Sequence, residues 1–298
     1  MLEAVDISHT FCAGTPFKRQ VLRGIQFKLA PGEVVLLTGP SGSGKTTLAR
    51  ILSGLVKPTQ GTMRFNGMDL NVIGSRPWPV SDRIVLASQY PERQFFANTV
   101  WDELSWGLRV GLGLDRAEIA DRLRLIAGDL GFPLEELAKR SPRSLSSGQQ
   151  RKAALASLLA LEPQVLILDE PLAGLNAKEG QRLISLLQNW HSQSRSMLII
   201  AHELELFFDW VEKVAVMDQG QMVFFGSLDE LCQSSDPTAR DAAFLPVMVQ
   251  FSFFLKQNGL SPGPITSDGP LVLRQLQEAL TKKRGIFLHT RKIEPSVS

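Results

Sequence analysis

The chain has 298 residues, 44% of them hydrophobic, which suits one large domain with a sizeable core and an appendage. Its formal net charge of +2 gives no global attraction for nucleic acid, so no nucleic-acid partner is expected. The two cysteines, Cys12 and Cys232, lack metal-ligand spacing and favour a reducing compartment over a disulfide framework. No apolar run reaches the ~18 residues of a membrane span, and we expect no signal peptide.

Residues 2–30 alternate between apolar and polar side chains, which is typical of β-strands. The apolar side chains predicted to share a face are, in the first strand, Val5, Ile7, His9 and Phe11 and, in the second, Ile25, Phe27 and Leu29. A loop through Thr15, Pro16 and Phe17 connects the two stretches. They therefore predict a pair of antiparallel strands.

A glycine-rich turn comes next, between the apolar run 34–37 and a helical pattern formed by Leu48, Ile51, Leu52 and Leu55. Strand, glycine-rich turn and helix are the context of a G-x-x-x-x-G-K-[ST] phosphate loop. Gly42 and Gly44 allow successive N–H groups to converge on one anion, at the positive end of the helix dipole. Lys45 adds a charge for the β- and γ-phosphates, and the Thr46 hydroxyl can complete a Mg²⁺ shell. The predicted nucleotide-binding residues are Gly39, Pro40, Ser41, Gly42, Ser43, Gly44, Lys45, Thr46 and Thr47.

The middle of the chain changes character after a short strand. Gly61 opens a hairpin with an Asn66-Gly67 turn, and the buried strand 84–87 ends at Gln89. Residues 99–162 contain no convincing strand, whereas Thr99, with Asp102 three residues later, predicts a helix start. Two further helices are predicted around residues 123–130 and after the sequence Leu145-Ser146-Ser147-Gly148-Gln149. We expect a helical subdomain, about residues 99–162, inserted into a nucleotide-binding core.

Strands and helices alternate again after this insertion. An apolar strand, 165–168, ends in Asp169 and Glu170; a helix around 183–190 and a buried strand, 197–201, which ends at His202, follow. A hairpin turn at 218–221 closes the pattern, which predicts βαβ units and a mostly parallel sheet. The strand end that carries both carboxylates then faces the phosphate loop. There Asp169 can hold Mg²⁺ directly or through water, and Glu170 can polarise an attacking water as general base.

The tail from residue 233 differs from the rest. Residues 234–237 are typical of a linker, and residues 244–255 are strongly apolar but too short to cross a bilayer. We interpret 244–255 as a buried or partner-facing helix and predict another helix through 271–280. The expected division is a nucleotide-binding domain, residues 1–232, and a C-terminal extension, residues 233–298, for dimerisation or partner contact.

The order of these motifs resembles the ATP-binding subunit of an ABC (ATP-binding cassette) transporter, over residues 1 to about 230. The matching elements are the phosphate loop 39–47, Gln89, the segment 145–149, Asp169-Glu170 and His202. The resemblance implies an α/β fold, a P-loop NTPase core with a mostly parallel sheet, N-terminal antiparallel strands and the inserted helical subdomain. It also implies binding and hydrolysis of ATP with Mg²⁺, at the cytoplasmic face of a membrane, through transmembrane partner subunits.

The resemblance also assigns roles to single residues. Gln89 would reach Mg²⁺ and link the site to the transmembrane partner, and His202 would contact the γ-phosphate and position Glu170. Phe11 stands where an aromatic ring often stacks on adenine, with Phe17 the weaker candidate and a core position the alternative for Phe11. The residues that would cap the ATP of a second subunit, in a homodimer or a heterodimer, are Ser146, Ser147, Gly148 and Gln149.

Two departures and one finer similarity stand out. Ser147 replaces a usual glycine and could crowd the loop, and Asn176 replaces a usual aspartate, which puts the coupling between the two sites in doubt. The Gln-x-Pro-Glu-x-Gln-aromatic pattern that starts at Gln89 is similar to ATPases of energy-coupling factor (ECF) transporters, which import vitamins and transition metals. The alternative function is a soluble ABC-type ATPase that acts on nucleic acid, ribosomes or a protein scaffold.

Overall fold

The computed structural model describes residues 1–70, 83–201, 204–207, 209–234, 236–260, 265–266 and 268–290, with the backbone alone for 280–290.

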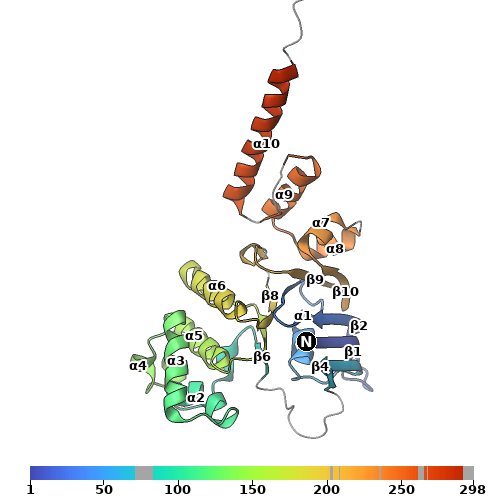
Figure 1. The fold of residues 1–298 in the computed structure, drawn as a ribbon. Coiled ribbons are helices and arrows are strands. Elements are labelled where there is room, and N and C mark those ends of the chain that lie inside the picture. Colours follow the sequence, from blue (N-terminus) through green and yellow to red (C-terminus); the bar gives the residue numbers. More distant parts are fainter. Residues whose placement is uncertain are drawn as a thin grey trace, which may run out of the picture.

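Six strands form the central sheet, in the order β10-β9-β3-β8-β7-β6 (Figure 1). They are β3 (Val34–Thr38), β6 (Ile84–Ala87), β7 (Val165–Asp169), β8 (Ser196–Ile200), β9 (Lys213–Asp218) and β10 (Gln221–Gly226). Every neighbouring pair from β9 to β6 is parallel, and only the β9–β10 hairpin is antiparallel. The prediction of a mostly parallel sheet is confirmed. The carboxyl ends of β3 and β7 therefore lie at the same edge of the sheet.

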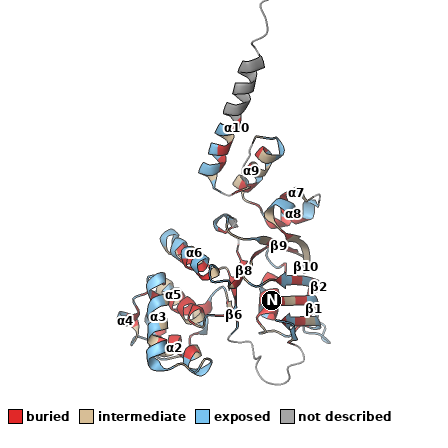
Figure 2. Ribbon diagram, in the orientation of Figure 1, coloured by how far each residue is buried: buried red, intermediate tan, exposed pale blue. Residues whose placement is uncertain are grey.

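Strand β3 is buried on both faces, which explains its unbroken apolar sequence. Val34 and Leu36 pack in the core on one side of the sheet, and Val35 and Leu37 in the core on the other. Figure 2 shows this burial along the central strands and along the inner faces of the helices around them. A strand covered on both sides holds the phosphate loop that follows it on a rigid support.

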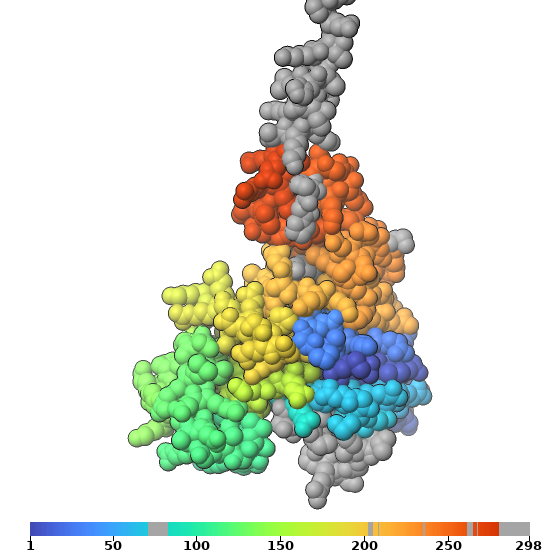
Figure 3. Space-filling view, viewed as in Figure 1, coloured from blue at the N-terminus to red at the C-terminus, as the bar shows by residue number. Residues whose placement is uncertain are grey.

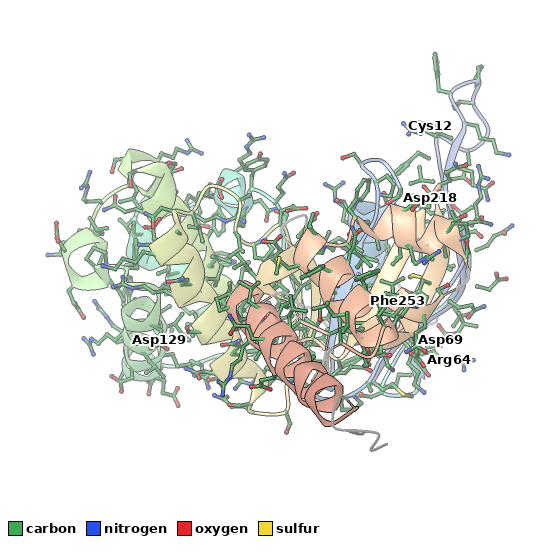
Figure 4. All side chains as sticks on the ribbon, turned by 90° about the horizontal axis from the view of Figure 1, so that it is seen from above. Cys12, Arg64, Asp69, Asp129, Asp218 and Phe253 are labelled. Carbon is green, nitrogen blue, oxygen red and sulfur yellow. The ribbon has the colours of Figure 1, made fainter. Side chains whose placement is uncertain are left out.

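Four strands form a second, antiparallel sheet in the order β2-β1-β4-β5. They are β1 (Leu2–Phe11), β2 (Arg19–Leu29), β4 (Gln60–Phe65) and β5 (Met68–Asp69). Asn66 and Gly67 both have positive φ angles, 50° and 81°, as the predicted two-residue hairpin turn requires. The loop from β1 to β2 projects from the body of the molecule, with Cys12 on it (Figure 4).

The predicted buried face of β1 is wrong in part. Asp6 has a φ of 55°, and the pairing of β1 shifts between Ala4 and Ile7, which is a β-bulge. The extra residue reverses the alternation, so that Leu2 and Ala4 share the buried side with Ile7, while Val5 is 39% exposed. Phe11, at the end of the strand, is 40% exposed and is not a core residue.

The α-helices are α1 (Lys45–Leu52), α2 (Val100–Val110), α3 (Arg116–Leu130), α4 (Leu134–Leu137), α5 (Ser147–Leu159), α6 (Ala177–His191), α7 (Leu228–Gln233), α8 (Pro237–Ala243), α9 (Val247–Gln257) and α10 (Gly269–Thr290). The short 3-10 helices within the described residues are η1 (Pro91–Gln94), η2 (Pro142–Ser144) and η3 (Leu204–Leu206).

Helices α2 to α5 gather on one side of the central sheet (Figure 1). The Thr99 hydroxyl accepts a hydrogen bond from the Asp102 amide, 3.1 Å away, so the predicted start of α2 is confirmed. The predicted extension of α1 to Leu55 is wrong, because α1 ends at Leu52 and Leu55 is 70% exposed. Gly54, with a φ of 81°, turns the chain away before Leu55 is reached.

The C-terminal helices continue from the β9–β10 side of the sheet and form an outer lobe (Figure 3). Helix α8 packs on β9 and β10, and α9 packs on α10. The apolar stretch 244–255 is split, because Phe244 turns the chain with a φ of 50° and Pro246 precedes α9. Among the described residues, none of the helices is both long and apolar enough to span a membrane.

Candidate functional site

The phosphate loop follows β3 and leads into α1, and its glycines are required by the backbone. Gly39 has a φ of 141°, and a Cβ there would lie 2.0 Å from the Met217 carbonyl oxygen. Gly42, with a φ of 80°, faces open space where a side chain would begin. The Gly220 amide donates to the Ser43 carbonyl, 3.0 Å away, and fixes the loop to the β9–β10 turn. The sequence thus forms a rigid cradle with room above Gly42.

Lys45 lies within this cradle. Its ammonium donates to the carbonyl oxygens of Gly39, at 2.7 Å, and Pro40, at 2.9 Å, and the side chain is buried. Burial lowers the pKa of Lys45, while the charges of Glu170 and Asp169 oppose that shift. The loop therefore holds a positive charge close to two carboxylates, at the N-terminus of α1.

The predicted metal ligands from β7 and α1 meet directly. The Thr46 hydroxyl donates to Asp169 Oδ2 at 2.9 Å, and Asp169 is buried at the end of β7. A hydroxyl and a carboxylate oxygen are ligands that suit Mg²⁺, which takes one or two carboxylates together with phosphate oxygens. The buried Ser43 hydroxyl has no hydrogen-bond partner within the described part of the chain. These donors and acceptors fit a magnesium-bound polyphosphate.

Glu170 follows Asp169 in an unusual backbone conformation. Its φ is 54°, and its amide donates to the Ile200 carbonyl at 2.8 Å, which anchors it to the end of β8. A non-glycine residue in this region of φ is uncommon and is often found at functional sites. The Glu170 side chain is half-buried, and Glu170 directly follows the buried Asp169 in the sequence. His202, predicted to position Glu170, lies outside the described residues.

Gln89 and Glu170 are joined by a residue that the sequence analysis missed. Arg151, on α5, donates through Nη1 to the Gln89 carbonyl and through Nη2 to the Glu170 carbonyl, the latter at 2.7 Å. The available signal was its spacing: Arg151 precedes Leu155 and Leu159 by one and two turns, on the buried face of α5. A charged residue on that face indicates a specific set of partners.

The segment predicted to cap a second subunit's ATP begins α5. Ser146 is the N-cap: its hydroxyl accepts from the Gln149 amide at 3.3 Å, and its own amide donates to Gln149 Oε1 at 3.1 Å. Ser146 and Ser147 are exposed. Ser147 occupies the first helical position, which accepts any L-residue without strain, so its Cβ fits within the chain itself.

Asn176, the second departure, is the N-cap of α6. The Asn176 Oδ1 accepts a hydrogen bond from the backbone amide of Glu179 at 3.0 Å, and the backbone amide of Asn176 donates to Glu179 Oε2 at 3.3 Å. Glu179 also pairs with Lys152 of α5 at 2.7 Å, which lowers the pKa of Glu179. The side-chain oxygen of asparagine caps a helix as well as that of aspartate would. The Glu179–Lys152 pair connects this cap to α5.

Phe11 borders a cavity of about 270 Å³ beside the phosphate loop. The lining residues are Phe11, Arg19, Val21, Gly42, Gly44, Lys45, Thr46 and Thr47. An exposed aromatic face next to an anion cradle is the arrangement that a nucleotide base requires. Phe17 is 83% exposed on the projecting loop and is not among the lining residues.

Comparison with known proteins identifies the family. A family model described as ABC transporter matches residues 22–173. The energy-coupling factor transporter ATP-binding protein EcfA2 of Acetivibrio thermocellus is 30% identical over 282 residues, 94% of this chain and 98% of the relative. The structure of cbiO1 from Clostridium perfringens, part of the ABC transporter complex cbiONQ, is 28% identical with a TM-score of 0.61, over 76% of this chain and 88% of that one.

A dimeric ATP-binding cassette in a post-hydrolysis state, bound to ADP and Pi, shares the fold with a TM-score of 0.67 at 22% identity, over 76% of this chain and 98% of that one. The chain belongs to the ABC transporter family as an ATP-binding and ATP-hydrolysing protein, and it is similar to the ATP-binding proteins of energy-coupling factor transporters.

Proposed function

We propose that this chain hydrolyses ATP at the phosphate-loop site to drive uptake of a vitamin or a transition metal ion through a transmembrane partner. The observation that carries the proposal is the 2.9 Å hydrogen bond between Thr46 and Asp169, because it brings the phosphate loop and the carboxylate strand into one site. The pattern of residues 89–95 supports the ECF type of transport.

Each residue of the site has a distinct task in this proposal. The amides of the loop 39–47 and the Lys45 ammonium hold the triphosphate of ATP. Thr46, Asp169 and Gln89 would hold Mg²⁺, which would neutralise charge on the β- and γ-phosphates. Glu170 accepts a proton from the attacking water, and His202 orients the γ-phosphate and Glu170.

The site requires a second subunit. Ser146, Ser147, Gly148 and Gln149 form the N-terminus of α5, where backbone amides and a serine hydroxyl suit an anion, and Ser146 and Ser147 are exposed to solvent. We propose that this end of α5 caps the γ-phosphate of ATP held by a second ATPase subunit, in a homodimer or a heterodimer. Differential affinity of the dimer for ATP and ADP then shifts it between closed and open states.

The contact with the transmembrane partner is proposed at exposed aromatic residues after Gln89. Phe96 and Trp106 are 58% and 45% exposed and pack edge to face, with ring centroids 5.3 Å apart. The Glu103 carboxylate accepts hydrogen bonds from the amides of Phe96, at 2.9 Å, and Ala97, at 2.8 Å, which holds the loop still. Exposed aromatic side chains on a fixed backbone are typical anchors of protein interfaces.

The proposal also includes a location and a division into domains. The chain is proposed to lie at the cytoplasmic face of the membrane, peripheral through its transmembrane partner. Residues 1–232 are the proposed nucleotide-binding domain, with the helical subdomain at about 99–162. The extension 233–298 is proposed to serve dimerisation or partner contact.

Co-purification tests the proposal. The full chain carrying an affinity tag is expressed in its own cells, membranes are solubilised in detergent, and the proteins retained with it are identified. Recovery of a multi-span membrane protein, and its loss in a Phe96→Ser, Trp106→Ser variant, is the expected result. Recovery with ribosomes or DNA, and none with a membrane protein, would overturn the proposal in favour of a soluble ABC-type ATPase.

A further inference from the structure

Arg151 is a buried cation at the junction of three segments that are distant in the sequence. The residue is 4% exposed. Its guanidinium donates to the backbone carbonyls of Gln89, after β6, and Glu170, after β7. It also faces Glu92 of η1 across a 3.7 Å ion pair. The junction thus joins α5 to two of the loops that carry catalytic roles in the proposed function.

A buried arginine is costly unless several acceptors satisfy it. Among the described residues Glu92 forms the ion pair with Arg151, the charge of Asp169 also favours the cation, and the hydrogen bonds of Nη1 and Nη2 go to backbone oxygens. Burial lowers the pKa of Arg151, and Glu92 opposes that shift. Packing alone would be better served by an apolar side chain at this position, like Leu155 one turn later. The retained charge therefore indicates a demand for fixed geometry at the two carbonyl groups.

The contacts connect the two proposed half-sites through a single side chain. Ser146, the N-cap of α5, faces the ATP of a second subunit in the proposed dimer, and Arg151 lies just over one turn further along the helix. We propose that Arg151 is a positioning residue: it fixes the backbone of Gln89 and Glu170 relative to α5, so that closure on one ATP aligns the catalytic loops for the other. This inference rests on the proposed roles of Gln89 and Glu170.

The guanidinium suits this task better than an ammonium. Its planar fork presents separate N–H groups to two acceptors at fixed angles, whereas a lysine ammonium is a point charge on a flexible stem. Arg151→Lys therefore keeps the charge opposite Glu92 but cannot hold both carbonyl groups in the same geometry. Arg124→Lys is the matched control, since Arg124 is an exposed arginine of α3 that pairs with Asp121 and Glu135.

The experiment measures steady-state ATP hydrolysis and amide hydrogen exchange on the full chain. For Arg151→Lys we expect kcat to fall on the order of 10²-fold, because small displacements of catalytic groups have effects of that size. The KM for ATP should stay within about threefold, since the phosphate loop is untouched. Without nucleotide, amides of residues 89–95 should exchange faster than in the native chain. Arg124→Lys should match the native chain in every measurement.

A native kcat together with native exchange at 89–95 in Arg151→Lys would overturn the inference. A proportional rise in KM would also overturn it, because Arg151 would then serve binding. If this variant does not fold, Glu92→Gln decides: it leaves both carbonyl bonds but removes the ion pair, and a several-fold fall in kcat is expected, whereas native values would overturn the inference. Glu170→Gln separates the two proposals, because its full activity would refute the proposed function whatever Arg151 does.

Discussion

The phosphate loop and the start of α5 are both helix N-termini suited to phosphate, but they differ in what surrounds them. The phosphate loop is enclosed by its own chain: Lys45 is buried, and the Ser43 carbonyl accepts a hydrogen bond from the β9–β10 turn. The start of α5 is exposed at Ser146 and Ser147. The phosphate loop is thus a complete anion-binding loop within one chain, whereas the start of α5 is a capped helix N-terminus whose outer surface is exposed.

This difference gives the two elements different expected sensitivities. Substitutions in the phosphate loop should alter ATP binding by a single chain. Substitutions at the start of α5 should leave that binding intact and alter turnover, which requires two chains in the proposed function. Arg151 contacts the loops of the first element from within the helix of the second. The following predictions test this contrast.

Lys45→Ala is expected to have the largest effect. It removes a charged hydrogen-bond donor to phosphate, worth about 1.5–3 kcal/mol, so ATP affinity should fall roughly 10- to 150-fold. Turnover should fall further, because the same charge stabilises the transition state. Calorimetry and phosphate release measure the two effects, with Lys57→Ala, at an exposed lysine, as the control. A loss of turnover with native ATP affinity would contradict the assigned role.

Glu170→Gln should separate binding from chemistry. The amide cannot accept the proton of the attacking water, and loss of a general base costs on the order of 10²- to 10⁴-fold in rate. ATP affinity should stay close to that of the native chain, because the phosphate loop is unchanged. Phosphate release and equilibrium binding are compared with those of Glu136→Gln, at an exposed glutamate of α4. Near-native turnover would reject Glu170 as the base.

Ser146→Asp tests the open face of α5. Aspartate caps a helix as well as serine does, so stability should be retained, but its charge repels a γ-phosphate. Turnover should fall roughly tenfold or more, because Ser146 is proposed to contact the ATP of the other subunit. ATP binding by a single chain should be unchanged. Ser146→Asn, equal in size and uncharged, is the control and should lose less activity. Equal turnover in both variants would show that Ser146 does not face phosphate.

Asn176→Asp should have the smallest effect. The capping bonds with Glu179 remain possible, and a favourable helix-dipole term is opposed by the nearby Glu179 carboxylate. The free energy of unfolding should change by less than about 0.5 kcal/mol, as measured by urea denaturation. A loss above ~1 kcal/mol would mean that Asn176 has a task besides capping.

The sequence alone predicted the elements whose signals are local. The phosphate loop, the alternating strands and the Thr99 cap each depend on a few neighbouring residues, and the structure has them where they were expected. The bulge at Asp6 was not predictable, because one inserted residue reverses the alternation without any change in composition. The end of α1 before Leu55 was missed for a different reason, because the apolar spacing was followed past Gly54, which was a visible stop signal.

Arg151 shows a different limit of sequence reasoning. Its spacing from Leu155 marks a buried position, but its partners come from loops after β6 and β7, which only the sheet order brings together. A long-range junction of this kind depends on topology, and no local pattern encodes it. His202 stays a prediction, because it lies outside the described residues.

The central claim is that ATP joins two copies of the nucleotide site, and the mass of the Glu170→Gln chain in solution tests it most directly. Light scattering after size-exclusion chromatography is run with and without ATP and Mg²⁺, alone and with a related ATPase subunit. The account predicts a single chain without ATP and a stable dimer with it, lost again in the Glu170→Gln, Ser146→Asp double variant. ATP bound at full occupancy to a chain that stays monomeric under every condition would contradict it.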